Sequence, residues 1–301
     1  MRPSIRLILR ETNELFQKHF GRLIAPALIA AFAEYWANLG FASVQHRLSH
    51  AFATMWLANR SAASLLLAAP VGIARLFAQW AVQWLLWGIA FAATVNIITA
   101  IQGGRDSRLP IALRSAAYQR GLPSLLIRLY WRLTLSGYLL MIASAGLGVL
   151  IYKFTGPNAF PPQHRILLEV LLFPVLYPPY LLYAARFSLA IPALAISPEA
   201  ETDPLRASIE KYRSWRAPIL IACFTVIVLS AICDQYLPVF ISSLSTQKLP
   251  YVASRTIWML VSLATSLLWV WLFVFLTRLY QHAGDEPESR SDVIDSLPDA
   301  L

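Results

Sequence analysis

Six long apolar runs are the feature that most constrains what this chain can fold into. A helix needs roughly 20 apolar residues to cross the hydrocarbon core of a bilayer, and every run is near or above that length. Only 14% of the 301 residues are charged, whereas a soluble domain has roughly 25%. We therefore predict an all-α, polytopic membrane protein with six transmembrane helices. The expected spans are about 23–42, 76–101, 133–152, 166–196, 217–240 and 257–280.

The basic residues indicate how these helices are oriented. The net charge of +9 would suit a nucleic-acid partner, but Lys and Arg gather beside the apolar runs instead. They are most numerous before the first run, between the second and third, and between the fourth and fifth. The positive-inside rule then predicts that both termini lie in the cytoplasm. We expect no cleavable signal peptide, because Arg6, Arg10, Glu11 and Glu14 interrupt the first apolar stretch.

Three segments that precede the odd-numbered runs share a helical periodicity. Their recurring positions are Ile5, Leu9, Thr12, Phe16 and His19 after Pro3; Ile111, Ser115, Tyr118, Leu122 and Leu125 after Pro110; and Leu205, Ile209, Tyr212, Trp215 and Ile219 after Pro204. This spacing places each set on one face of a helix. We predict three amphipathic helices in the cytoplasmic interface of the membrane, each feeding a transmembrane hairpin. The alternative is three unrelated basic loops with accidental periodicity.

The three units define the expected domain organisation. We predict one membrane domain over 1–282, built from repeats at about 1–102, 103–196 and 197–282. Residues 283–301 are rich in acids and poor in apolar residues, which predicts a disordered cytoplasmic tail.

The same segments carry a resemblance to a known family. The relevant stretches are LRETNELFQKHFGRLIAPAL, LPIALRSAAYQRGLPSLLI and ARFSLAIPALAISPEAETDPLRASIEKYRSW. They resemble the six-span membrane domain of some bacterial glycerophosphodiester phosphodiesterases and the stand-alone YciC-type inner-membrane proteins. In that family an Arg, a P-x-L and an acidic turn precede such a helix, here Arg186, Pro192 to Leu194, and Glu199 to Asp203. The resemblance implies fold and membrane location, but not phosphodiesterase activity.

Two charges inside apolar runs form the first candidate site. Glu34 lies roughly 18 Å along a helix from Arg22, and Arg186 lies roughly 16 Å from Ser197. Since an unpaired charge at that depth is unfavourable, we predict that Glu34 and Arg186 pair. The pair would be either a structural clip, with Arg186 alternatively reaching toward headgroups, or a substrate or proton site.

The other polar candidates belong to spans two and four. Asn96 or Tyr183 is expected to assist the Glu34–Arg186 pair. Tyr177, Tyr180 and Tyr183 lie next to a Pro-broken stretch, which suits either a discontinuous helix lining a transport site or a kinked helix with packed aromatics. His46 and His50 have metal-ligand spacing on a helix, but lack a third ligand. We expect no catalytic residues, no metal and no cofactor.

These observations lead to one functional prediction and one alternative. We expect a non-enzymatic integral inner-membrane protein that interacts with lipids, anionic headgroups in particular, or that acts as an accessory to a membrane partner. The alternative is a transporter or lipid translocator with a mid-membrane site around Glu34 and Arg186. A water-filled cavity between spans one, two and four would favour the alternative.

Overall fold

The computed structural model describes residues 4–59, 62–137, 180–197, 203–233 and 251–284, and all of the regular structure in these ranges is helical. The fold prediction is therefore confirmed in its class. The elements with fixed bounds are α1 (Ile5–Lys18), α2 (Phe20–Asn59), α3 (Ala62–Gln102), α4 (Leu109–Ala117), α7 (Ala190–Ile196), α8 (Pro204–Ser214), α9 (Arg216–Ala231) and α11 (Tyr251–Gly284). Further helical residues lie at 122–137 and 180–185.

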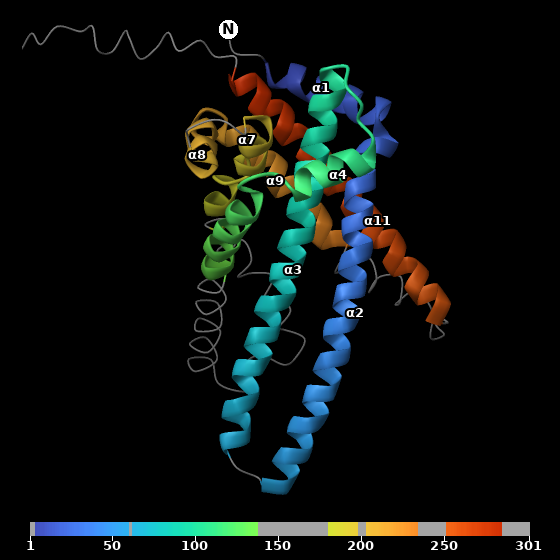
Figure 1. Cartoon of the computed structure of the whole chain (residues 1–301), viewed down its shortest axis with the longest axis vertical. Coiled ribbons are helices and arrows are strands. Elements are labelled where there is room, and N and C mark those ends of the chain that lie inside the picture. Colours follow the sequence, from blue (N-terminus) through green and yellow to red (C-terminus); the bar gives the residue numbers. More distant parts are fainter. Residues whose placement is uncertain (1–3, 60–61, 138–179, 198–202, 234–250, 285–301) are drawn as a thin grey trace, which may run out of the picture.

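Helices α2 and α3 form a long antiparallel hairpin. They have 40 and 41 residues, so each is about 60 Å long at about 1.5 Å per residue. In Figure 1 the hairpin extends well past the other described helices. Both helices run beyond the predicted spans of 23–42 and 76–101, and α3 continues through Pro70. Proline removes one backbone hydrogen bond from a helix, and a membrane helix tolerates this loss when neighbouring groups compensate for it.

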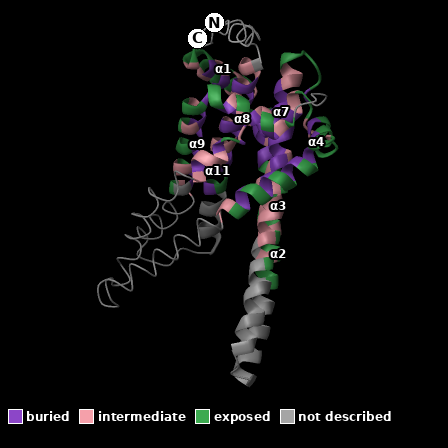
Figure 2. Cartoon of the chain, turned by 90° about the vertical axis from the view of Figure 1, so that its left-hand side faces the viewer, coloured by how far each residue is buried: buried purple, intermediate pink, exposed green. Residues whose placement is uncertain are grey.

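The three short helices α1, α4 and α8 lie together at one end of the molecule (Figure 1). Here α1 packs on α11, α4 on α3, and α8 on α7. Among the residues whose burial is described, most of the buried ones lie toward this same end, as the purple residues of Figure 2 show. The predicted amphipathic helices are thus present as helices, and they gather where the long helices start or finish.

Helices α1 and α8 turn into the next helix through the same corner. The corner residues His19 and Trp215 have nearly equal backbone angles, φ −120° and ψ 23° against φ −118° and ψ 24°. In both, the corner N–H bonds to the carbonyl four residues back, and the corner carbonyl accepts from the N–H four residues ahead. From α8 to α9 the chain bends by 102°. A tight corner of this kind sets a short helix across the long helix that follows it.

The correspondence between α1 and α8 extends along the whole helix. Each has one i, i+4 ion pair on its exposed face, Arg10–Glu14 at 2.7 Å and Arg206–Glu210 at 3.0 Å. Each buries one hydroxyl completely, that of Thr12 or of Ser208. The matched positions, all displaced by the same number of residues, are Arg10 and Arg206, Thr12 and Ser208, Glu14 and Glu210, Phe16 and Tyr212, His19 and Trp215, and Leu23 and Ile219.

Helix α4 departs from the predicted stripe. Its buried residues are Ala112 and Ala116, whereas Ile111 is 54% and Tyr118 83% exposed. Small residues allow close approach between helices in a membrane protein, so the alanines face the protein and the larger side chains face outward. Its corner is also different, because it is longer and passes through Gly121 at φ +88°, a conformation that favours glycine.

Three described helical segments are long and apolar enough to cross a membrane, namely Phe20–Val44, Phe77–Gln102 and Leu260–Ala283. A fourth is obtained if α8 and α9 are counted as one bent segment. Their outward side chains are apolar, since Phe32 is 63%, Trp36 59% and Ile221 67% exposed. Such a surface suits lipid better than water. The predicted third span, except for 133–137, and the first part of the fourth lie outside the described residues, so the expected six spans are not all seen.

Candidate functional site

Glu34 lies on α2 and faces α3. Its carboxylate accepts hydrogen bonds from Gln83 Nε2 at 2.8 Å and from Trp87 Nε1 at 2.6 Å. About one turn further along the hairpin, Gln79 Nε2 donates to Asn38 Oδ1 at 2.9 Å. A carboxylate in a membrane span needs such donors because no water is available to replace them. Glu34 therefore belongs to a polar ladder that holds the two helices of the hairpin together.

Arg186 lies elsewhere, and its side chain is exposed. Among the contacts of the described residues, Arg186 makes no ion pair with Glu34. The Glu34 carboxylate is instead bonded by donors from α3. The physical reason is a break in the predicted fourth span, since the helix of 180–185 ends before Arg186 and α7 begins only at Ala190. Arg186 thus lies in a turn and not in the middle of a continuous helix.

The break is held by a buried hydroxyl of α8. Ser208 Oγ donates to the Arg186 carbonyl at 2.7 Å and accepts from the Leu189 N–H at 3.1 Å. Buried backbone groups that lose their helical partners need others. On α7, the Leu194 carbonyl likewise accepts from Gln119 Nε2 at 2.9 Å. The discontinuity is therefore a well-bonded structural feature, located toward the cytoplasmic end predicted for this span.

The remaining predicted site residues do not converge on Glu34. Tyr183 packs edge-on against Phe187 at 5.3 Å between ring centroids. Tyr180 lies beside Gly137, where an added Cβ would come within 3.8 Å of the tyrosine ring. Asn96 Nδ2 donates to Ser115 Oγ at 3.5 Å and so connects α3 to α4. The structure therefore divides the predicted polar site into a ladder on α2 and α3 and a separate cluster around 180–189.

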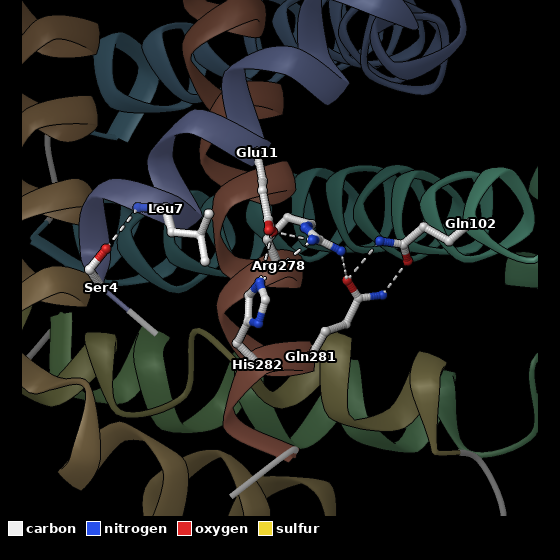
Figure 3. A network of polar contacts seen from close by, with 7 residues as sticks. All are labelled: Ser4, Leu7, Glu11, Gln102, Arg278, Gln281 and His282. Atoms are coloured by element: carbon white, nitrogen blue, oxygen red, sulfur yellow. Dashed lines mark hydrogen bonds and ion pairs between the residues drawn. The ribbon is translucent and has the colours of Figure 1, made fainter. Parts of the chain in front are cut away.

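A polar network that the sequence analysis missed joins α1 to α11 (Figure 3). The Glu11 carboxylate is bonded by Arg278 and lies 2.8 Å from His282 Nε2. Arg278 Nη1 donates to Gln281 Oε1 at 2.9 Å, and Gln281 Nε2 donates to Gln102 Oε1 at 2.7 Å. Arg278 and His282 are one turn apart near the end of the last span, and that spacing was the only sequence signal for this site.

The network also fixes the charge of Glu11. Burial alone would raise the pKa of this carboxyl group. Hydrogen bonds and positive charge from His282 and Arg278 outweigh burial, so the pKa is held below its ordinary value of 4.5. The carboxylate form is therefore favoured in the folded protein. The result is a charged clamp between the first described helix and the last.

Two pockets flank α8. The larger, of about 360 Å³, lies on the side of the 122–137 helix and includes Arg132, Arg206 and Arg213 in its wall. The smaller, of about 220 Å³, lies on the side of α7 and α11 and includes Lys211 and Tyr280. Lys211 Nζ stands 3.6 Å from the centroid of the Tyr280 ring, a cation–π contact. Both pockets are at the end of the molecule where the short helices gather.

Possible metal ligands do not cluster in the described part of the chain. No group of three or more His, Cys, Asp or Glu there could hold a metal ion. His46 and His50 lie on helical backbone of α2, as their spacing requires, but their side chains fall outside the described residues. Tyr177 and the acidic tail also fall outside them.

No protein-family model, no curated protein and no solved structure matches this chain. The fold and the site therefore define the class directly. It is a helical membrane protein with three candidate spans, or four with the bent pair α8 and α9. In this chain the short helices α1, α4 and α8 lie at one end (Figure 1).

Proposed function

We propose that this chain is a non-enzymatic, six-span protein of the bacterial inner membrane that binds anionic lipid headgroups at its cytoplasmic face. In that role it would organise lipid or support a membrane-protein partner. The single observation that carries the proposal is the 102° bend from α8 into α9. If α9 crosses the bilayer, α8 must run nearly parallel to its surface. The matching corner at His19 gives α1 the same relation to α2.

The exposed faces of these helices suit an anionic surface. Arg6 and Arg10 on α1, and Arg206 and Arg213 on α8, all have exposed side chains. A basic residue near an anionic leaflet contributes about 1 kcal/mol. On α4 the exposed Ile111 and Tyr118 would enter the boundary between headgroups and acyl chains, as apolar and amphipathic side chains of interfacial helices do.

The matched positions of α1 and α8 support the threefold repeat. A unit of one short helix and one hairpin, used three times, gives six spans. Among the described ranges, each short helix is followed by a longer apolar helix, including the 122–137 helix after α4. The resemblance to the membrane domain of bacterial glycerophosphodiester phosphodiesterases and to YciC-type proteins belongs to the same proposal, and so do the cytoplasmic position of both termini and the absence of enzymatic activity.

A lipid translocator is the competing function, and the broken helix at 186–189 is the observation in its favour. Discontinuous helices line substrate sites in transporters. However, the groups that such a site would expose are engaged within the chain, since Ser208 bonds the backbone of the break and α3 bonds Glu34. This arrangement favours a structural role for both features.

Lipid analysis of the purified chain tests the proposal. The protein would be extracted in mild detergent, and its co-purified phospholipids would be compared by class with those of the membrane. We expect anionic lipids to be enriched severalfold, and we expect the variant Arg6→Gln/Arg10→Gln, altered on the exposed face of α1, to show less enrichment. Arg290→Gln, in the acidic tail, is the control. A bound-lipid composition equal to that of the membrane would refute the proposal.

A further inference from the structure

The larger pocket beside α8 has an unbalanced charge. Its wall contains three arginines, Arg132, Arg206 and Arg213, together with Asp203 and Glu210. Glu210 is paired with Arg206 at 3.0 Å, and Asp203 is paired with Arg128 at 3.0 Å. Both carboxylates of the pocket are therefore already engaged. Within the described residues, Arg132 and Arg213 have no carboxylate partner.

Arg132 is an exposed residue whose guanidinium contacts an aromatic ring. Its guanidinium carbon lies 5.5 Å from the centroid of the Phe187 ring, and a guanidinium held over an aromatic face keeps its remaining donors free. Arg213, on α8, also lines the pocket. Its counterpart at the matched position of α1 is Gln17, so the helix pattern itself does not require an arginine here.

We propose that this pocket binds the phosphate group of an anionic phospholipid, with Arg132 and Arg213 as its ligands. Arginine is well suited to phosphate because its planar donors form paired, charge-assisted hydrogen bonds. The volume of about 360 Å³ is within the usual range for small-molecule sites, roughly 300–1,000 Å³. The proposal rests on the interfacial position of α8 that the proposed function assumes, because that position places the pocket at the level of the headgroups.

The lining of the pocket agrees with a lipid as the source of the phosphate. Leu205 and Ile209 contribute apolar surface beside the arginines. A phosphodiester headgroup presents an anionic phosphate joined to an apolar glycerol ester, which matches such a wall. An inorganic phosphate ion would use the arginines alone.

Native mass spectrometry of the full chain in mild detergent tests the assignment, with phosphatidylglycerol titrated against phosphatidylcholine. Wild type is expected to retain one phosphatidylglycerol more tightly than phosphatidylcholine. Arg213→Gln, which introduces the residue found in α1, is expected to weaken that binding about tenfold. Arg132→Gln is expected to act similarly, and Arg132→Lys to recover part of the affinity. Arg114→Gln on α4, exposed and outside the pocket, is the matched control.

Failure of the pocket and failure of the proposed function give different results. If phosphatidylglycerol is preferred but Arg114→Gln weakens it as much as Arg213→Gln, the chain binds anionic lipid diffusely and the pocket assignment is wrong. If no variant or wild type prefers phosphatidylglycerol, the proposed function fails as well. If phosphatidylglycerol is preferred only in the variant Glu199→Gln/Glu201→Gln, the chain's own acids pair with the pocket arginines in wild type. The pocket assignment is then again wrong.

A final arm separates the two sources of phosphate. Inorganic phosphate would be titrated into the lipid-depleted protein while thermal unfolding is followed. Phosphate would be added at a few times the concentration of lipid needed for binding. At that concentration we expect no increase in the unfolding temperature that depends on Arg132 and Arg213. Stabilisation by inorganic phosphate that is lost in Arg213→Gln, without any lipid preference, would assign the pocket to a soluble anion and overturn the lipid proposal.

Discussion

Helices α1 and α8 are built alike and used differently. They share the corner geometry, the exposed Arg–Glu pair and the buried hydroxyl. On α1, however, Glu11 turns toward Arg278 and His282 of α11 and closes a charged clamp. On α8 the position that matches Glu11 is Ala207, and the nearby arginines line a pocket instead.

The buried hydroxyls differ in the same way. Ser208 bonds two backbone groups of the broken segment at 186–189. Thr12, its counterpart, has no hydrogen-bond partner for Oγ1 in the described part of the chain. The comparison shows that α1 and α8 share one helical framework. The helix on which each packs determines the role of a given position: Glu11 forms ion pairs, Ser208 bonds the backbone of the 186–189 turn, and Thr12 has no partner among the described residues.

Removing the clamp should have the largest effect. Glu11→Ala leaves Arg278 and His282, both mostly buried, without their carboxylate. We expect a loss of about 2–3 kcal/mol in the free energy of unfolding, the range for charged hydrogen bonds in partly buried positions. Thermal unfolding in detergent, followed by fluorescence of the 10 tryptophans, measures it. Glu14→Ala, which removes an exposed acid from the same helix, is the control, and an equal loss in both variants would contradict the clamp.

Acid should act on the same clamp. Because the pKa of Glu11 is below 4.5 in the folded protein, its carboxylate stabilises the fold above the unfolded-state pKa. That contribution is lost as the pH falls from about 4.5 through the lower, folded-state pKa. The melting temperature of wild type should therefore decrease in this window more steeply than that of Glu11→Gln. Parallel pH profiles for the two proteins would show that Glu11 is not the titrating group.

Ser208→Ala should have a smaller effect. It removes one hydrogen bond to the Arg186 carbonyl and one from the Leu189 N–H, which leaves both backbone groups unsatisfied. We expect a loss of about 1–2 kcal/mol. Hydrogen exchange should also become faster at the Leu189 amide. Unchanged protection at that amide would mean that α8 does not hold the break.

Thr12→Val should have the smallest effect and the opposite sign. It replaces an unpartnered, fully buried hydroxyl with a methyl group of similar shape. Removal of an unsatisfied polar group is neutral or stabilising, here by up to about 1 kcal/mol. The same unfolding measurement detects it. A destabilisation as large as that of Ser208→Ala would show that the two matched hydroxyls have equivalent partners after all.

The sequence predicted best what depends on local order. The stripes of α1 and α8 follow from spacing alone, and Leu205, Tyr212 and Trp215 are all buried as expected. The stripe of α4 was wrong, because Ala112 and Ala116 pack inward while Ile111 faces outward. In a membrane protein an apolar side chain can face either protein or lipid, so periodicity does not tell which face is buried.

Side-chain partners across long separations were not predictable in the same way. Glu11 and Arg278 are 267 residues apart, and nothing in either local sequence identifies the other. Glu34 and Arg186 were paired by an estimate of depth that assumed a continuous fourth span. The turn at 186–189 contradicts that assumption, and the partners of Glu34 are instead Gln83 and Trp87 of α3.

The proposed function requires that α1, α4 and α8 lie on the cytoplasmic side of one membrane. Single cysteines would be introduced as Gln17→Cys, Ala117→Cys and Ser214→Cys, all at exposed positions, after replacement of Cys223 and Cys233. Asn59→Cys, at the far end of α2, serves as the outer site. With a membrane-impermeant maleimide and an intact inner membrane, we predict labelling at 59 alone, and labelling at the other three only after lysis. Labelling of 17, 117 or 214 from outside would contradict the claim.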